Sequence, residues 1–277
     1  MILAALAAMT MNAQEMSYGA IEVGDFENAS EIYNGSYFDM APTNFYLAHT
    51  GAQMIYTTNE LADLQLLEGV EINKLTFKFN NAGTWEEIYR DVKLYLQETE
   101  ATEFAVIEGV KQFFTFDEPV LETSVSYDFV TSMDEDIELA LELTEPFEIA
   151  AGKSLLVTVV FDAVDDDNCT MGSDYAPFYT SGIRRQAMVY TNNWTSFVDY
   201  AQGEDFPDAT ALLGCGTNVE LPVTRIDYSY PTSTGVQEIE AAKASDNAYY
   251  NLMGQKFNGE NLPAGIYIHN GQKVMVK

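Results

Sequence analysis

The sequence predicts an all-β protein: an antiparallel β-sandwich, followed by a small C-terminal β module. Three observations predict this fold class. Apolar and polar residues alternate with period two over several runs, one short run is almost continuously apolar, and turn-forming residues separate the runs without any long helical periodicity. With 277 residues, the chain is long enough for one large β domain and a small appendage.

The charge balance narrows the classes of partner. Lysine and arginine number 13 against 43 acidic residues, so the net charge is −30, while hydrophobic residues make up 47% of the chain. The apolar share is too high for a disordered chain. The negative charge excludes general attraction to nucleic acid phosphates and to anionic lipid headgroups. It is compatible with cationic partners and with calcium.

The N-terminus has the pattern of an atypical signal peptide at residues 1–13. An apolar run from Met1 to Met9 is too short to cross a bilayer, which takes about 20 residues. Small residues and Gln14 follow, although the positively charged n-region is missing, and a buried N-terminal helix is the alternative. Since Gln14 is not a cysteine, we expect no lipid anchor at this end. The pattern predicts export through the periplasm to the outer cell surface or the extracellular space, with no integral membrane segment.

The sandwich domain is expected over residues 41–230, after an N-terminal extension at residues 14–40. One helical turn is predicted at residues 58–63, capped by Thr58 or Asn59. Strands are predicted near residues 45–57, 70–79, 92–96, 112–116, 124–130, 137–143, 155–161, 187–191 and 223–230.

For two of these strands the sequence also predicts a position in the sheet or an irregularity. Residues 155–161 are almost all apolar and rich in β-branched side chains, which favours a central strand over a helix. Val70 and Ile72 fall out of phase with Leu75 in the next strand. A bulge or turn near Asn73 would restore the phase.

The end of the chain is predicted to be a linker, residues 231–247, followed by the β module, residues 248–277. The linker is small, polar and poor in aromatic residues. Asn270-Gly271 lies between two apolar runs and suits a two-residue hairpin, because both central positions need positive φ. A module this small buries little core alone, so we expect it to pack on another element or to serve as a recognition tag.

The tail resembles a known class of sequence. The motifs are residues 250–255, 262–268 and 271–274. They resemble the sorting tails of secreted Bacteroidetes proteins, which are associated with type IX secretion, although this tail is shorter than a full sorting domain. The resemblance implies the secretion machinery as a partner of the tail.

The central region, residues 41–200, contains a second set of matching stretches: residues 53–56, 60–61, 72–79, 90–96, 98–99, 104, 145–147 and 155–161. These stretches resemble the adhesin-like jelly-roll modules of the same phylum, of the type seen as cleaved adhesin domains beside gingipain proteases. This resemblance implies a jelly-roll-like β-sandwich with a binding or adhesive role and does not carry over a ligand.

Histidine and cysteine chemistry has little support in the sequence. His49 and His269 have no nucleophile motif near them, and no zinc, P-loop or dinucleotide-binding motif is present. We therefore expect no transition-metal site and no cofactor other than a candidate calcium ion. Cys169 and Cys215 are candidates for one disulfide in an exported protein, with two free thiols as the alternative.

The candidate calcium site is an acidic stretch after the most buried strand. Calcium takes six to eight oxygen ligands, and such a loop supplies several of them within reach. The spacing does not match an EF-hand, and a charged loop tip that keeps the sheet end soluble is the alternative. The candidate ligands are Asp162, Asp165, Asp166, Asp167 and Asn168.

Aromatic residues supply a candidate glycan site. Tyr190, Asn193, Trp194 and Tyr200 combine flat rings with an amide, which is a pattern suited to holding a sugar. The alternative is that these residues fill the sandwich core or an edge, the commoner location of Trp and Tyr.

The sequence thus favours a secreted or cell-surface noncatalytic protein, adhesin-like, which recognises an extracellular protein or glycan through its sandwich loops. Two alternatives stay open. The first is a carbohydrate-active enzyme or its carbohydrate-binding accessory domain, since acidic residues are abundant enough for a two-carboxylate site. The second is a fimbrial or structural subunit that assembles by strand addition.

Overall fold

The computed structural model of the chain describes residues 15–29, 41–43, 47–80, 87–128, 136–164, 178–192, 195–202, 216–232, 248–251, 256–258, 262–269 and 272–276. The chain divides into two compact units, Met1–Thr232 and Ser233–Lys277. The predicted signal peptide at residues 1–13 lies outside the described residues. The predicted linker at residues 231–247 spans the division, and all of it after Thr232 is outside them as well.

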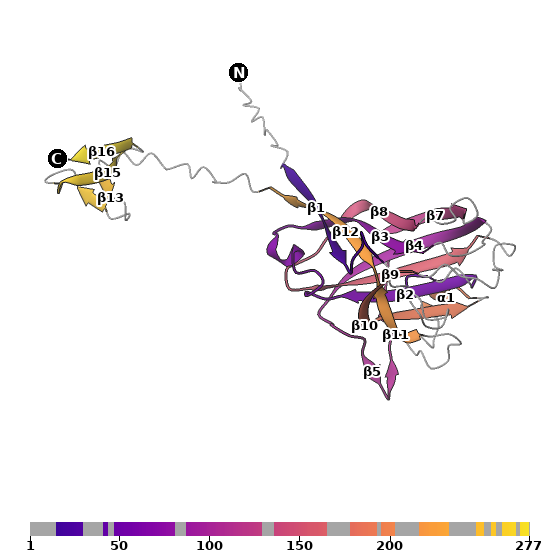
Figure 1. Cartoon of the computed structure of the whole chain (residues 1–277). Helices are drawn as coiled ribbons and strands as arrows, with labels where there is room; N and C mark the ends of the chain where they lie inside the picture. Colours follow the sequence, from indigo (N-terminus) through magenta and orange to yellow (C-terminus); the bar gives the residue numbers. More distant parts are fainter. Residues whose placement is uncertain are drawn as a thin grey trace, which may run out of the picture. The chain divides into compact units, whose positions relative to one another are not determined.

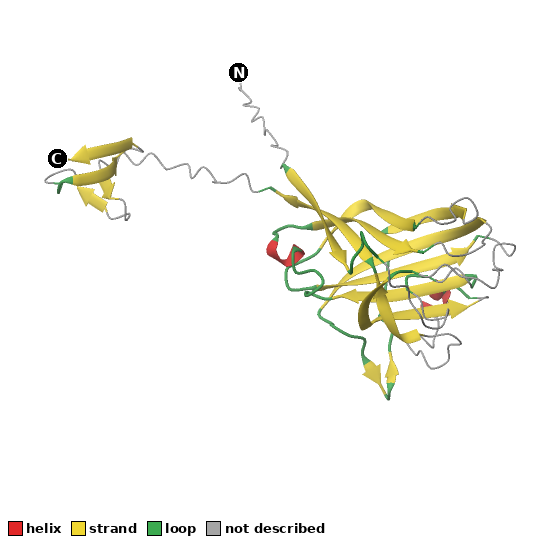
Figure 2. Cartoon of the chain, in the orientation of Figure 1, coloured by secondary structure: helices red, strands yellow, loops and turns green. Residues whose placement is uncertain are grey.

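The described part of the larger unit contains two large antiparallel sheets and one two-stranded sheet (Figures 1 and 2). The first has the strand order β1 (Met16–Val23), β12 (Thr224–Pro231), β3 (Glu71–Phe79) and β8 (Ile137–Glu148). The second has the order β11 (Gly216–Pro222), β10 (Thr180–Asn192), β2 (His49–Tyr56), β9 (Ser154–Ala163), β4 (Glu87–Thr99) and β7 (Leu121–Asp128). The predicted all-β antiparallel sandwich is confirmed.

One hydrophobic core joins the two sheets. Leu75 and Phe77 of the four-stranded sheet belong to the same buried cluster as Val157 and Val159 of the six-stranded sheet. This follows from the period-two patterns, because each strand turns one set of alternate side chains toward the facing sheet. The outward set on the four-stranded sheet is polar, as in the ion pair between Lys74 and Asp227, 2.9 Å apart.

The two more detailed strand predictions are confirmed: residues 155–161 form a central strand, and the strand that contains Ile72 and Leu75 has a bulge. β9 is bonded to β2 on one side and to β4 on the other, and eight consecutive residues from Ser154 are buried. In β3 the pairing register shifts between Ile72 and Lys74 against β8, which is the expected bulge. Because of this shift, Ile72 and Leu75 both reach the core.

The sandwich begins earlier in the chain than predicted. Residues 16–23, placed in the N-terminal extension by the sequence, form β1 at the edge of the four-stranded sheet. Only Ile21 and Val23 of this strand are buried, so the alternation that marks a strand covers too few residues to be seen in the sequence.

Residues 112–116 differ from the prediction, since they form no regular strand within the sheets. They follow a short hairpin, β5 (Val106–Ile107) and β6 (Val110–Lys111), and cross the outer face of the six-stranded sheet. The amide of the buried Gln53 on β2 holds them there. Its oxygen accepts from the Phe114 backbone N–H at 2.7 Å, and its nitrogen donates to the Phe114 carbonyl at 2.8 Å. Two apolar faces, one on each side of this sheet, explain why β2 and β9 are buried almost throughout.

We call the second apolar layer, on the outer face of the six-stranded sheet, the aromatic layer. The short helix α1 (Phe197–Ala201) completes it. Neighbouring rings of the aromatic layer are in contact. The centroids of Tyr190 and Phe197, for example, are 5.3 Å apart. The members are Tyr95, Phe104, Phe113, Phe114, Phe116, Tyr190, Phe197 and Tyr200.

The predicted helical turn after β2 exists as turn residues leading into a 3-10 helix, η2 (Leu64–Leu66). The turn is capped by Thr57, one residue earlier than predicted, whereas η2 itself begins after Asp63 without a side-chain cap. Thr57 accepts from the Asn59 N–H through its hydroxyl, and the Glu60 carboxylate accepts from the Thr57 N–H. The Glu60 contact is that of a capping box, whereas the Thr57 hydroxyl accepts from the second residue of the turn and not from the third.

The smaller unit is a four-stranded antiparallel sheet with the order β14 (Lys256–Asn258), β13 (Ala248–Asn251), β15 (Gly265–His269) and β16 (Gln272–Val276). His269 pairs with Gln272, so β15 and β16 form the hairpin expected around Asn270-Gly271.

Candidate functional site

A row of polar side chains crosses one end of the six-stranded sheet. Register places Asn192, His49, Asp162, Asp91 and Ser124 directly opposite one another on five adjacent strands, β10, β2, β9, β4 and β7. Directly paired residues point to the same side of a sheet, which here is the outer face. We call these five residues the polar row. On β10 and β2, the next row toward the middle of the sheet is Tyr190, which belongs to the aromatic layer, and Gly51, which Phe197 of that layer covers.

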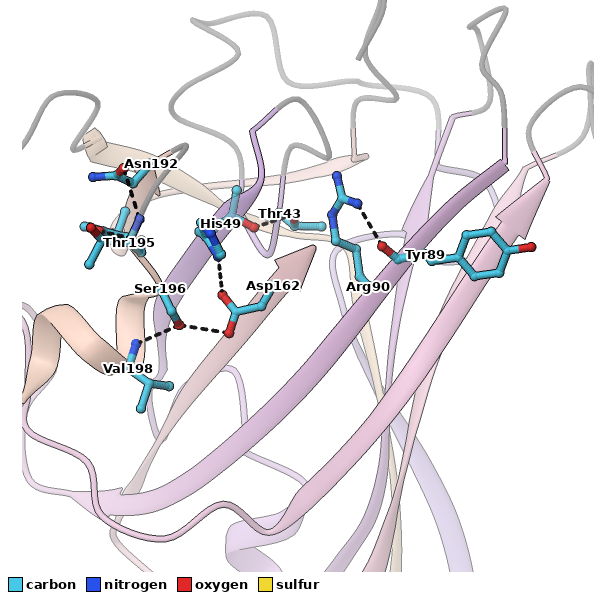
Figure 3. Close-up of polar contacts among 11 residues, drawn as sticks. Thr43, His49, Tyr89, Arg90, Asp162, Asn192, Thr195, Ser196 and Val198 are labelled. Atoms are coloured by element: carbon cyan, nitrogen blue, oxygen red, sulfur yellow. Dashed lines mark hydrogen bonds and ion pairs between the residues drawn. The ribbon is translucent and has the colours of Figure 1, made fainter. Parts of the chain in front are cut away.

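The centre of the polar row is a chain of hydrogen bonds (Figure 3). His49 Nδ1 and Asp162 Oδ1 are 2.8 Å apart, and the Ser196 hydroxyl donates to Asp162 Oδ2 at 2.8 Å. Because an ionised carboxylate only accepts, the hydrogen on His49 belongs on Nδ1. The side chains of His49 and Asp162 are each 21% exposed, so a ligand can reach them.

The order of these three groups is not the order that nucleophilic catalysis uses. In a Ser-His-Asp triad the histidine contacts the serine and removes its proton. Here Asp162 lies between His49 and Ser196, and the Ser196 oxygen also accepts from the Val198 N–H at 3.2 Å as the N-cap of α1. Ser196 therefore positions the helix, and Asp162 ties the helix to the sheet.

The β7 end of the polar row is more open than its centre, whereas the β10 end is partly buried. Asp91 and Ser124 are exposed, and the Ser124 hydroxyl donates to Asp91 Oδ1 at 2.5 Å. Asn192 Oδ1 accepts from the Thr195 N–H at 3.3 Å, which links the end of β10 to the residue before the Ser196 cap of α1. The row presents carboxylate, amide, hydroxyl and imidazole groups at fixed strand positions, a set that bonds to the hydroxyls of a sugar or to the polar groups of a peptide.

Polar groups also line the inner face at this end of the sandwich. Arg90 on β4 points to the same side as the core residue Val92 and is almost fully buried, with its guanidinium donating to the Tyr89 carbonyl at 2.8 Å (Figure 3). The hydroxyls of Thr43 and Thr50 are 2.6 Å apart.

The candidate calcium ligands are only partly described. Asp162 lies at the end of β9 and already accepts from His49 and Ser196, while Asp165, Asp166, Asp167 and Asn168 lie outside the described residues. Within the described ranges, no three His, Cys, Asp or Glu side chains form a group suited to a metal ion. Calcium binding stays a prediction, and so does the disulfide, since Cys169 and Cys215 are outside the described residues too.

The candidate glycan residues divide in the same way. Tyr190 is 1% exposed and belongs to the aromatic layer, so its ring is packed by protein, the alternative that the sequence left open. Tyr200 is partly buried and stacks on it with centroids 5.1 Å apart. Burial raises the pKa of Tyr190 to about 12. Asn193 and Trp194 lie outside the described residues, so glycan contact at them stays a prediction.

The sequence did not reveal the polar row. Its members are separated by up to 143 positions, from His49 to Asn192, and only the register of four strand pairs brings them together. A polar residue at the end of each of several predicted strands is the one signal that was present.

No known protein family matches the chain, and no curated protein matches its sequence. Among the described residues, no helix is long and apolar enough to span a membrane.

Proposed function

We propose that this protein is a noncatalytic binding protein of the cell exterior, adhesin-like, which recognises a protein or glycan partner at the end of the sandwich that carries the polar row. The single observation that carries the proposal is the polar row itself. Five polar side chains in register across five strands form a rigid, partly exposed platform. Binding residues are commonly held in this way, at the ends of strands on a stable scaffold.

The aromatic layer supports placing the contact at this end and not on the middle of the sheet. In many sandwich proteins an open sheet face takes the ligand, whereas here Phe104 and Phe113 are buried over that face. Each buried Phe stabilises the packed aromatic layer by about 1.5–3 kcal/mol, so displacing this layer from the sheet to admit a ligand is costly.

The noncatalytic part of the proposal is supported by the contacts of Asp162. A general base must reach the proton that it removes, at about 2.6–3.2 Å. The Ser196 hydroxyl instead donates to Asp162 and caps α1, so it does not give its proton to His49.

Export and the role of the tail belong to the proposal and rest on the sequence. The signal-peptide pattern at residues 1–13 predicts passage through the periplasm, and the tail motifs predict recognition by secretion machinery. Deleting residues 254–277 tests the tail, because unchanged export and surface display of the truncated chain would remove its sorting role.

Binding is tested on a glycan and matrix-protein array, run with and without calcium. The informative variant is Asp91→Asn, which keeps the shape and removes an exposed carboxylate of the polar row. Glu138→Gln, on the outer face of the other sheet, is the matched control. We expect Asp91→Asn to weaken binding of any hit about tenfold or more, since hydrogen bonds to charged groups contribute about 1.5–3 kcal/mol.

Two results would contradict the proposal. One is equal binding by wild type and Asp91→Asn together with loss of binding in Glu138→Gln, which would place the contact on the four-stranded sheet. The other is release of reducing sugar from an array glycan, which would make the protein an enzyme.

A further inference from the structure

The two faces of the C-terminal sheet differ in chemistry. On one face the aromatic rings pack on one another. Tyr249 stacks on His269 at 4.1 Å, and the edge of Tyr267 meets Tyr249 and Phe257 at 6.3 Å and 5.5 Å between centroids. Tyr267 is buried, and its hydroxyl donates to the Pro263 carbonyl at 2.9 Å. The ring contacts that stabilise this small sheet are therefore on this face.

The opposite face is apolar in the middle and cationic at both sides. Register places Lys256, Tyr250, Ile268 and Lys273 in one row across β14, β13, β15 and β16. Ile266 and Met275 form a parallel row beside it on the same face. Tyr250 is 40% exposed, Ile268 38% and Met275 68%, and both lysines are exposed. We call these six residues the lysine-flanked face.

Charge on this face contrasts with the rest of the protein. The described strands of the C-terminal sheet carry two lysines and no carboxylate side chain, within a chain of net charge −30. Both lysines point to the apolar face, and they lie on the two outermost strands. A second copy of this face would bring lysines opposite lysines, which disfavours self-pairing.

We propose that the lysine-flanked face docks an acidic amphipathic helix of a partner protein. The lysines are three strand spacings apart, about 14 Å, and a helix with its side chains is about 10–12 Å wide. A helix laid along the strands thus covers Tyr250 and Ile268 with its apolar stripe. Glutamates on its two flanks then reach Lys256 and Lys273. A one-layer sheet gains by this contact, because its apolar face needs a covering element.

This inference goes beyond the proposed function, since it follows from strand register in the C-terminal sheet and holds whether or not the tail directs export. It concerns a different unit from the polar row. A negative array experiment would therefore leave the helix-docking proposal standing. A negative peptide experiment would likewise leave the proposed function of the polar row standing.

The test uses the full chain and a defined probe. The probe is a labelled amphipathic peptide of about 18 residues, long enough to hold a helix, with a leucine stripe and glutamates on both flanks. A second peptide has lysines in place of the glutamates. Fluorescence anisotropy measures both affinities for wild type, for Lys273→Glu and for Lys153→Glu, a matched charge change in a turn of the larger unit.

We expect the acidic peptide to bind wild type more tightly than the basic one. Lys273→Glu should weaken the acidic peptide about threefold to tenfold and strengthen the basic peptide, since reversal turns one exposed ion pair into a repulsion. Lys153→Glu should change neither. Met275→Asp, exposed and without a role in the ring contacts, should abolish binding of both peptides while leaving the melting temperature unchanged.

Three results would overturn the proposal. The first is equal binding of the two peptides by wild type. The second is an unchanged acidic-peptide affinity in Lys273→Glu. The third is binding of phosphatidylglycerol vesicles that Lys273→Glu abolishes while the acidic peptide fails to bind, which would assign the face to anionic lipid.

Discussion

The packing of α1 on β2 predicts a specific effect on stability at Gly51. A Cβ atom built on Gly51 would lie 2.4–2.5 Å from three carbon atoms of Phe197, whereas ordinary contacts are 3.4–4 Å. The ring would have to move by about 1 Å, so Gly51→Ala should cost about 1–3 kcal/mol of stability through overpacking. Phe197→Ala removes a fully buried ring and should cost about 3–5 kcal/mol.

The double variant decides whether this contact is the cause. With the ring gone, two of the three close atoms are removed, and only the Cβ atom of residue 197, 2.5 Å away, still has to move. Gly51→Ala should therefore cost less stability in the Phe197→Ala variant than in wild type. Urea denaturation followed by circular dichroism measures all four free energies of unfolding. Equal costs of Gly51→Ala in both backgrounds would refute the packing of α1 against β2.

Three further predictions concern the same layer. Gln53→Leu should cost about 1–3 kcal/mol, because it leaves the Phe114 backbone groups without their partner, and hydrogen exchange should show Phe114 losing protection before the sandwich core does. Ser196→Ala should cost about 0.5–2 kcal/mol in urea denaturation, whereas Ser196→Thr, which can still cap α1, should cost less. Burial raises the pKa of Tyr95 and of Tyr190 from 10.0 to about 12, so the folded state holds these protons more tightly than the unfolded chain. The contribution of the two protonated hydroxyls to the free energy of unfolding is therefore complete below pH 10 and is lost as the pH rises to about 12. Urea midpoints at pH 9, 10 and 11 should fall less steeply in Tyr190→Phe than in wild type, and parallel slopes would contradict the assignment.

The strands were predictable because their signals are local. The run at residues 155–161 needs a buried environment wherever it lies, and the phase slip between Ile72 and Leu75 needs a bulge in any pairing. The prediction of a strand at residues 112–116 was wrong for a related reason. Their apolar content indicated burial, but an extended segment packed across a sheet by a glutamine has the same composition as a strand within it.

The candidate site was less predictable, because it depends on register between distant strands. Nothing near Tyr190 in the sequence tells whether its ring meets a ligand or α1, since α1 is placed by Ser196 and by the space above Gly51. His49 had no motif beside it for the same reason, because its partner Asp162 is 113 positions away.

The central claim is that the polar row binds the partner. Hydrogen exchange of the full chain, with and without a ligand taken from the array, tests it most directly. We predict that the ligand slows exchange at His49, Asp91, Asn192 and their immediate neighbours, with no change on the outer face of the four-stranded sheet. Protection confined to Lys74 and its neighbours on that sheet would contradict it.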